Sequence, residues 1–266
     1  MKNLLTNLKK SREEIKKANF LKRITNNLGN IVVKTDKIIC YVDDKNLKTE
    51  YQKYVSYQLN LDKVPKKEIT EYSEYNKPIY YIFENIIFDK DIIIKSSQAT
   101  NIIFKNCIFN EGICINESDN VIFENNKYHS LNFFMIRKCE NITFSNENCL
   151  IDTNGMNKLK KENIKIQIEA TKKFEMINSK LDTTNYENGE IDIKAKEILI
   201  KDSKITSSEI YSNSFKCNLD NNSNIYGEKI ICINNKEDNL TLDNIDTPNL
   251  VYNQKVYENV KSKKTK

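Results

Sequence analysis

The stretch Ile113–Asn125 reads Ile-Cys-Ile-Asn-Glu-Ser-Asp-Asn-Val-Ile-Phe-Glu-Asn, and it decides the fold. It holds two short runs rich in β-branched residues, Ile113–Ile115 and Val121–Phe123, which are typical of β-strands. The second run leads into Asn125, and asparagine tolerates the left-handed backbone of a sharp turn better than most residues. The stretch therefore predicts two successive strands, the second of which ends at a sharp turn.

The second run and its turn residue recur along the chain. The pattern apolar-x-apolar-x-Asn, once with Asp in place of Asn, ends at Asn85, Asn106, Asn125, Asn146, Asn178, Asp202 and Asn244. The steps between these positions are 21, 19, 21, 32, 24 and 42 residues. Most steps correspond to one coil of the chain, the last to two coils, and the step of 32 to one coil with an insertion. The first run recurs as well, for example at Ile92–Ile94 and Ile191–Ile193.

Strands that repeat at this spacing, with no helix between them, exclude a fold of alternating strands and helices. A single coil cannot bury its apolar face, so successive coils must stack and share one core. Connections between parallel strands are almost always right-handed. The sequence therefore predicts a mainly β protein, a right-handed parallel β-helix over residues 78–248.

The repeated turn residues have a structural role in this arrangement. Because stacked coils lie about 4.8 Å apart, amide side chains at equivalent positions can hydrogen-bond along the stack. We expect the seven turn residues from Asn85 to Asn244 to form such a ladder.

On these repeats the chain resembles the parallel β-helix repeat family, the superfamily that includes pectate lyases and related polysaccharide-active and phage proteins. Enzymes of this family hold acidic residues from neighbouring coils on one outer face. In this chain the column before the turn residues reads Glu84, Lys105, Glu124, Ser145, Ile177, Lys201 and Asp243, so no two carboxylates stack. We therefore expect no catalytic residues, and the sequence favours a protein that is not an enzyme.

The flanks differ from the repeats. Residues 1–77 are expected to form a helical or α+β cap on the first coil, or else an interaction region, with a helix over residues 2–28. We expect this helix to cover an apolar stripe formed by Ile82, Ile103 and Ile122, which should point outward. Residues 249–266 are expected to form a basic tail.

Charge and cysteine content indicate which partners and which cellular compartment the sequence favours. Residues 1–30 carry a net charge of +6 and residues 251–266 a net charge of +4, which leaves −5 for the middle. The basic ends could contact nucleic acid. The seven cysteines include no Cys-x-x-Cys pair, which is typical of reduced thiols in the cytoplasm. No apolar run is long enough to cross a membrane, and no metal or cofactor motif is present.

The insertion behind the step of 32 residues is the candidate partner-binding site, because insertions in solenoids gather on a face used for binding. It contains residues suited to adaptable apolar contacts and to attraction of an acidic partner. These residues are Asn154, Met156, Lys158, Leu159, Lys160 and Lys161.

The sequence thus favours a non-enzymatic protein that binds another macromolecule, a protein or a protein complex, through a β-helical scaffold. The resemblance to the family suggests that it could be a phage or mobile-element inhibitor of host machinery. A carbohydrate-active lyase or hydrolase is the first alternative, and a nucleic-acid-binding accessory protein is the second. The sequence leaves the oligomeric state open.

Overall fold

A computed structural model of the chain describes residues 2–61, 76–96, 100–129, 131, 133–150, 163–219, 222–233, 245–252 and 255–261. Its first elements are α1 (Lys2–Ile24), β1 (Gly29–Val33), β2 (Ile38–Val42), α2 (Asp44–Tyr51), β3 (Ser56–Leu61), β4 (Ile79–Glu84), β5 (Ile87–Phe88), β6 (Asp91–Ser96), β7 (Thr100–Lys105) and β8 (Ile108–Phe109). They are followed by β9 (Ile113–Glu124), β10 (Lys127–Tyr128), β11 (Phe134–Ser145), β12 (Asn148–Leu150), β13 (Asn163–Ile177), β14 (Lys180–Asp182), β15 (Asn188–Lys201), β16 (Lys204–Leu219), β17 (Asn224–Ile233), β18 (Ile245–Tyr252) and β19 (Lys255–Val260).

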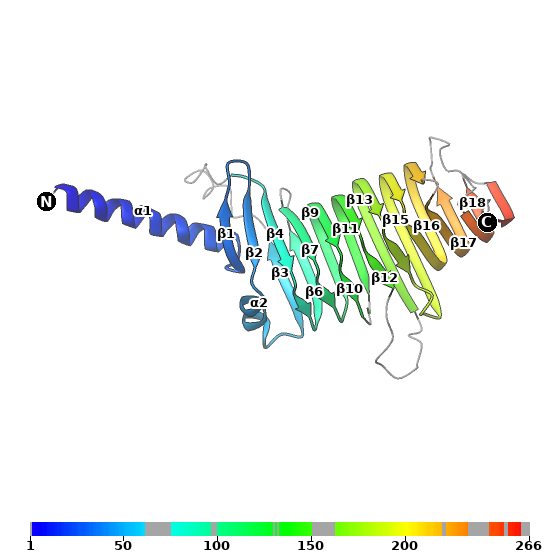
Figure 1. Ribbon diagram of the computed structural model, residues 1–266, viewed down its shortest axis with the longest axis horizontal. Helices are drawn as coiled ribbons and strands as arrows, with labels where there is room; N and C mark the ends of the chain where they lie inside the picture. Colours follow the sequence, from blue (N-terminus) through cyan, green and yellow to red (C-terminus); the bar gives the residue numbers. More distant parts are fainter. Residues whose placement is uncertain are drawn as a thin grey trace.

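The strands form a solenoid of about six turns that extends along the long axis of the molecule (Figure 1). From β2 to β18 the principal strands stack in parallel and in chain order, each paired with its neighbours in the next coils. The predicted mainly β fold, a parallel β-helix, is therefore confirmed.

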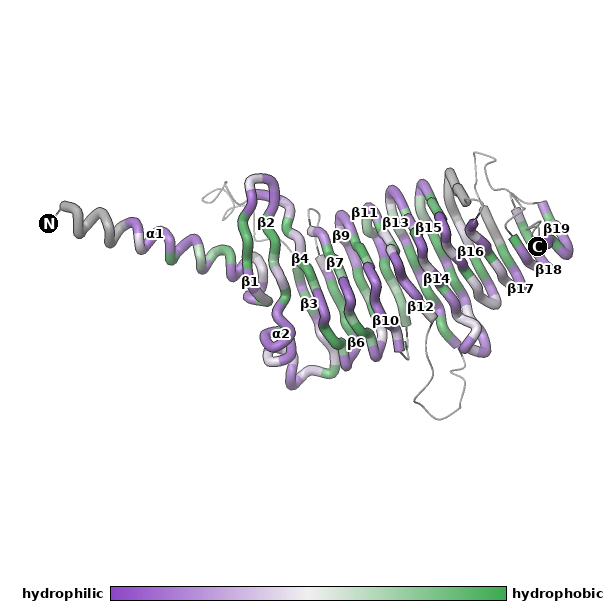
Figure 2. The backbone as a smooth tube through the Cα atoms, in the orientation of Figure 1, coloured by the Kyte–Doolittle hydropathy of each residue, from purple (hydrophilic) through white to green (hydrophobic). Residues whose placement is uncertain are grey.

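Inward-facing aromatic rings form the core of the first coils. The strand register aligns Phe83, Phe104, Phe123 and Phe144, all of which are buried. The Phe83 and Phe104 ring centroids lie 4.9 Å apart, and those of Phe104 and Phe123 lie 5.1 Å apart. Hydrophobic and hydrophilic residues alternate along these coils (Figure 2), because successive residues of a strand point to opposite sides.

The two strands predicted for each coil are joined in the central coils. β9 and β11 each continue through a bend, where Glu117 has φ 62° and Lys138 has φ 54°. Both halves of each strand pair with the same neighbouring strand, so the hydrogen-bonded ladder continues through the bend. The sequence placed the strands correctly but predicted a break that the ladder does not require.

The N-terminal region closes the first coil. Phe20, Leu28 and Leu47 are buried in the shared core, and β1 pairs antiparallel with β2 at the end of the sheet. The helix α1 ends at Ile24 rather than at residue 28, because Asn26 and Asn27 adopt left-handed backbone angles.

The position of α1 differs from the prediction. The helix extends away from the first coil along the long axis and does not lie over β4, β7 and β9 (Figure 1). Its last turns attach through Phe20 to the end of the solenoid, and this attachment directs the remainder outward. The prediction that the helix covers Ile82, Ile103 and Ile122 is therefore wrong. These three isoleucines are aligned as predicted, and each is half-buried.

The C-terminal end of the solenoid is a hairpin. β18 pairs in parallel with β17 and antiparallel with β19. The boundary predicted at residue 248 falls inside β18, and residues 255–260 of the predicted tail form β19. β18 therefore has a neighbour on both sides, and the antiparallel β19 forms the last strand of the sheet at this end.

Candidate functional site

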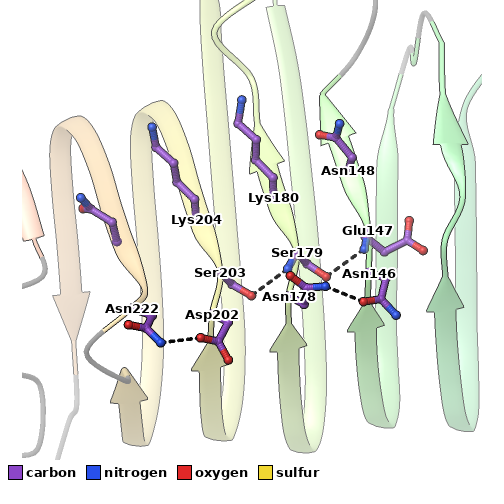
Figure 3. A pocket seen from close by; sticks show the side chains of 11 residues that line it. Asn146, Glu147, Asn148, Asn178, Ser179, Lys180, Asp202, Ser203, Lys204 and Asn222 are labelled. Carbon is purple, nitrogen blue, oxygen red and sulfur yellow. Dashed lines mark hydrogen bonds between the residues drawn. The ribbon is translucent and has the colours of Figure 1, made fainter.

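A groove of about 640 Å³ runs across four coils at the corner where the strands turn. Three of the coils each contribute three consecutive residues, from the residue after one strand to the first residue of the next, and the fourth coil contributes Asn222 and Asn224 (Figure 3). One outer row consists of Asn146, Asn178, Asp202 and Asn222, and the other consists of Asn148, Lys180, Lys204 and Asn224. Glu147, Ser179 and Ser203 lie between the two rows.

The left-handed turn residues create this corner. Asn85, Asn106, Asn125, Asn146, Asn178 and Asp202 have φ angles between 46° and 58°. The residue after each of them turns inward and is buried, and the next residue points outward again. Asparagine and aspartate accept this backbone because their short polar side chains reduce its steric cost.

The side chains of the turn residues form the predicted ladder in segments. Asn125 Nδ2 donates to Asn106 Oδ1 at 2.6 Å, and Asn178 Nδ2 donates to Asn146 Oδ1 at 2.7 Å. Asp202 Oδ1 accepts a bond of 2.6 Å from Asn222 Nδ2. The bonded members of the ladder are half-buried or exposed, so it stabilises the outside of the corner.

The sequence pattern missed Asn222, which no apolar-x-apolar-x run precedes. A different similarity could have found it, since Asp202-Ser203-Lys204-Ile205 matches Asn222-Ser223-Asn224-Ile225. The predicted ladder member Asn244 lies outside the described residues.

Replacing Asn125 by leucine is expected to lower the free energy of unfolding by about 2 kcal/mol. A left-handed backbone costs a β-carbon-bearing residue about 1–2 kcal/mol, and the bond to Asn106 contributes about 1 kcal/mol. Asn125→Gly is the matched control, because glycine keeps the backbone angle and removes only the amide. Denaturant unfolding should show a larger loss for leucine; equal losses would contradict the role assigned to the backbone.

A second polar column lies beneath the groove, inside the solenoid. The backbone N–H of each corner residue donates to the side chain of its counterpart in the next coil. Asn126 N donates to Glu147 Oε1, Glu147 N to Ser179 Oγ and Ser179 N to Ser203 Oγ, each at 3.0 Å. Ser203 N continues the column with a bond of 3.1 Å to Ser223 Oγ. These buried side chains satisfy backbone groups that the strand ladder leaves unpaired at the corner.

Glu147 is the one carboxylic acid in this column. Its Oε2 accepts a bond of 2.6 Å from the Tyr128 hydroxyl, and its Oε1 accepts a bond of 3.0 Å from Asn126 Nδ2. Burial raises the pKa of Glu147 to about 7, although the hydrogen bonds from Tyr128 and Asn126 lower it. The carboxyl group is turned into the solenoid, so it is not available to a ligand in the groove.

The groove surface is therefore rich in amide and ammonium groups. Asp202 is the only residue of the two outer rows with a carboxylate. Lys180 Nζ lies 2.8 Å from Asp182 Oδ2, so its charge is partly balanced by its own strand. A glycosidase places two carboxyl groups on either side of the bond that it cleaves, and the residues that line this groove offer no such pair.

The column before the ladder alternates in charge over its first three members, Glu84, Lys105 and Glu124. Lys105 Nζ lies 3.5 Å from Glu124 Oε1 in the next coil, and the strand register aligns Glu84 with Lys105. An ion pair this exposed contributes little to stability. Within the described ranges, no group of three or more histidine, cysteine, aspartate or glutamate side chains is arranged to hold a metal ion.

The predicted partner-binding residues, Asn154, Met156, Lys158, Leu159, Lys160 and Lys161, lie outside the described residues. The segment that contains them begins directly after β12, whose first residue, Asn148, lines the groove. The chain is described again from Asn163, the first residue of β13. The described strands on either side of the insertion are therefore β12, which begins at one end of the groove, and β13.

The side chains of His129 and of the described cysteines have ordinary environments. His129 Nδ1 lies 2.8 Å from Asn110 Oδ1 at an exposed position. Cys40, Cys107, Cys139 and Cys149 are buried free thiols, and Cys114 is a half-buried one. In the part of the chain that the structure covers, neither helix combines the length and apolar character needed to cross a bilayer.

Comparison with known proteins gives no match to a family model, to a curated protein or to a solved structure.

Proposed function

We propose that the protein is a non-enzymatic binding protein whose β-helix presents the corner groove to another macromolecule, a protein or a protein complex. The observation that carries this proposal is the lining of the groove. Two rows of hydrogen-bonding side chains follow the axis across four coils, and the one buried carboxyl group beneath them faces the core.

The spacing of the groove suits a partner segment that lies along the solenoid. Equivalent side chains of neighbouring coils are about 4.8 Å apart, so they offer a repeated set of donors and acceptors. Lys180 and Lys204 add positive charge to one row, which would attract an acidic segment and position its carboxylates. The lysine-containing insertion, which follows β12 in the sequence, is proposed to contribute to the same contact.

The proposal also includes the cellular compartment and the origin of the protein. The free cysteines support a reducing compartment such as the cytoplasm. The resemblance to the superfamily of pectate lyases and phage β-helix proteins supports an origin in a phage or mobile element, where such a scaffold could inhibit host machinery. The alternative of a lyase or hydrolase receives less support, because the groove lacks a carboxylate pair.

Replacing Lys204 by glutamate is expected to weaken partner binding about tenfold, since reversing one charge at a polar contact costs on the order of 1.4 kcal/mol. Lys204 is exposed, so folding should be retained. Lys95→Glu is the matched control, an exposed strand lysine that does not line the groove.

The measurement is quantitative capture from host lysate on immobilised wild-type protein and on both variants. A protein retained by the wild type and by Lys95→Glu, but depleted with Lys204→Glu, would support the proposal. Equal recovery on all three surfaces would contradict a binding role for the groove. Turnover of an acidic polysaccharide by the wild type would favour the enzymatic alternative instead.

A further inference from the structure

The helix α1 has a long exposed part that its own solenoid does not cover. It extends outward from the first coil, and hydrophilic residues dominate the part coloured in Figure 2. Phe20 is buried near its attached end, whereas Ser11, Ile15 and Ala18 are exposed, and the side chain of Ile15 is 58% exposed. Isolated helices of this length are only marginally stable in water, because most helical stability comes from packing of an apolar face.

The sequence of α1 has a seven-residue period that is typical of helices packed on one another. Leu4, Leu8, Ser11, Ile15 and Ala18 follow one another at alternating spacings of four and three residues. This spacing places them along one side of the helix, which we call the seam, as in the core positions of a coiled coil. Large and small residues alternate through most of the seam, so two copies could bring their backbones close together.

Most basic residues of α1 lie away from this seam and repeat with the same period, although Lys22 occupies the next seam position, near the attached end. Lys2, Lys9, Lys16 and Arg23 are seven residues apart, at the positions next to the outermost face of a coiled coil. Lys10 and Lys17 are also seven residues apart, and each directly follows one of these basic residues. The net charge of +6 in residues 1–30 therefore lies mainly on the far side of the helix, where it opposes the approach of a second copy least.

The attachment of α1 leaves the seam free to face a partner. At 100° per residue, Phe20 projects from the side of the helix roughly opposite to Ser11 and Ala18. Phe20 packs into the core of the first coil, so the seam is turned away from the surface that anchors the helix. We propose that α1 is a self-association helix, whose seam packs against the α1 seam of a second copy of the chain.

Sedimentation equilibrium of the full chain in the micromolar range tests this proposal. One chain has a mass of 31.2 kDa, and the wild type should have at least twice this mass. Ile15→Asp places a charge in the seam and should reduce the mass to that of one chain. Lys16→Asp is the matched control; it changes the neighbouring residue on the far side and should leave the assembly intact.

Three outcomes would overturn the proposal. A wild type that remains a single chain throughout the concentration range would overturn the proposal, as would an Ile15→Asp variant with the mass of the wild type. Loss of assembly in Lys16→Asp alone would point to attraction between basic helix and acidic solenoid, and would also overturn it. Thermal unfolding of the β-helix should be the same in both variants, because Ile15 and Lys16 are exposed.

Discussion

Replacing Phe104 by alanine is expected to lower the free energy of unfolding by about 3–5 kcal/mol, the range seen when a buried aromatic ring is removed from a core. Phe104 is fully buried, and its ring lies within 6 Å of four other aromatic rings in the first coils. A coil contacts only its neighbours, so the cavity cannot be filled from elsewhere in the solenoid. Denaturant unfolding measures the loss.

The adjacent residue provides the control for this prediction. Ile103 points to the opposite side of the same strand and is half-buried, so Ile103→Ala should cost about 1 kcal/mol. A loss as large as that of Phe104→Ala would mean that another surface covers the outer face of β7. The pair therefore tests the assignment of inner and outer faces as well as the packing of the core.

The solenoid could be predicted because its signal is local and repeated. Each coil restates the same run of apolar residues and the same turn residue, and the left-handed backbone at Asn106, Asn125 and Asn146 is the physical reason for the repetition. The ladder bonds follow from the stacking distance alone, which is why Asn106 and Asn125 were expected to meet. Insertions make the pattern less regular, as does Asp202, which stands where the other repeats have Asn, but the repeat can still be recognised.

The groove and the column beneath it could not be predicted in the same way. Glu147, Ser179 and Ser203 are polar residues directly after a turn, a position that in sequence alone indicates the surface. Their burial depends on the inward rotation that follows a left-handed residue, and their bonds join coils that are 24 to 32 residues apart. The course of α1 was missed for a related reason, because helical periodicity predicts an apolar face but does not identify its partner.

Replacing Glu147 by glutamine is expected to stabilise the protein at pH 8 and to have little effect near pH 4. The pKa of Glu147 is about 7 in the folded protein and near 4.5 in an unfolded chain. Between these two values the folded state binds more protons than the unfolded state, so the free energy of unfolding falls as pH rises. The full loss corresponds to about 3 kcal/mol, and it is reached above the folded pKa.

Glutamine can keep the contacts of the acid form at every pH. Its amide oxygen can accept the bonds from Asn126, and its amide nitrogen can donate to the Tyr128 hydroxyl. The variant should therefore lack the decrease in stability that we expect for the wild type between about pH 4.5 and pH 7. Denaturant midpoints measured from pH 4 to pH 8 would show this. Glu190→Gln, which removes an acid paired with Lys165 on the outer surface, is the control and should keep the wild-type profile.

The position of Glu147 connects this titration with the groove. Asn146 and Asn148, on either side of it, each begin one of the two outer rows, and its own N–H donates to Ser179 in the next coil. A charged carboxylate in this buried column destabilises the coil that holds that end of the groove. Hydrogen exchange at the amides of residues 146–149 should therefore be faster at pH 8 than the intrinsic pH dependence of exchange explains, and Glu147→Gln should remove the excess. An unchanged excess in the variant would place the pH-sensitive group elsewhere.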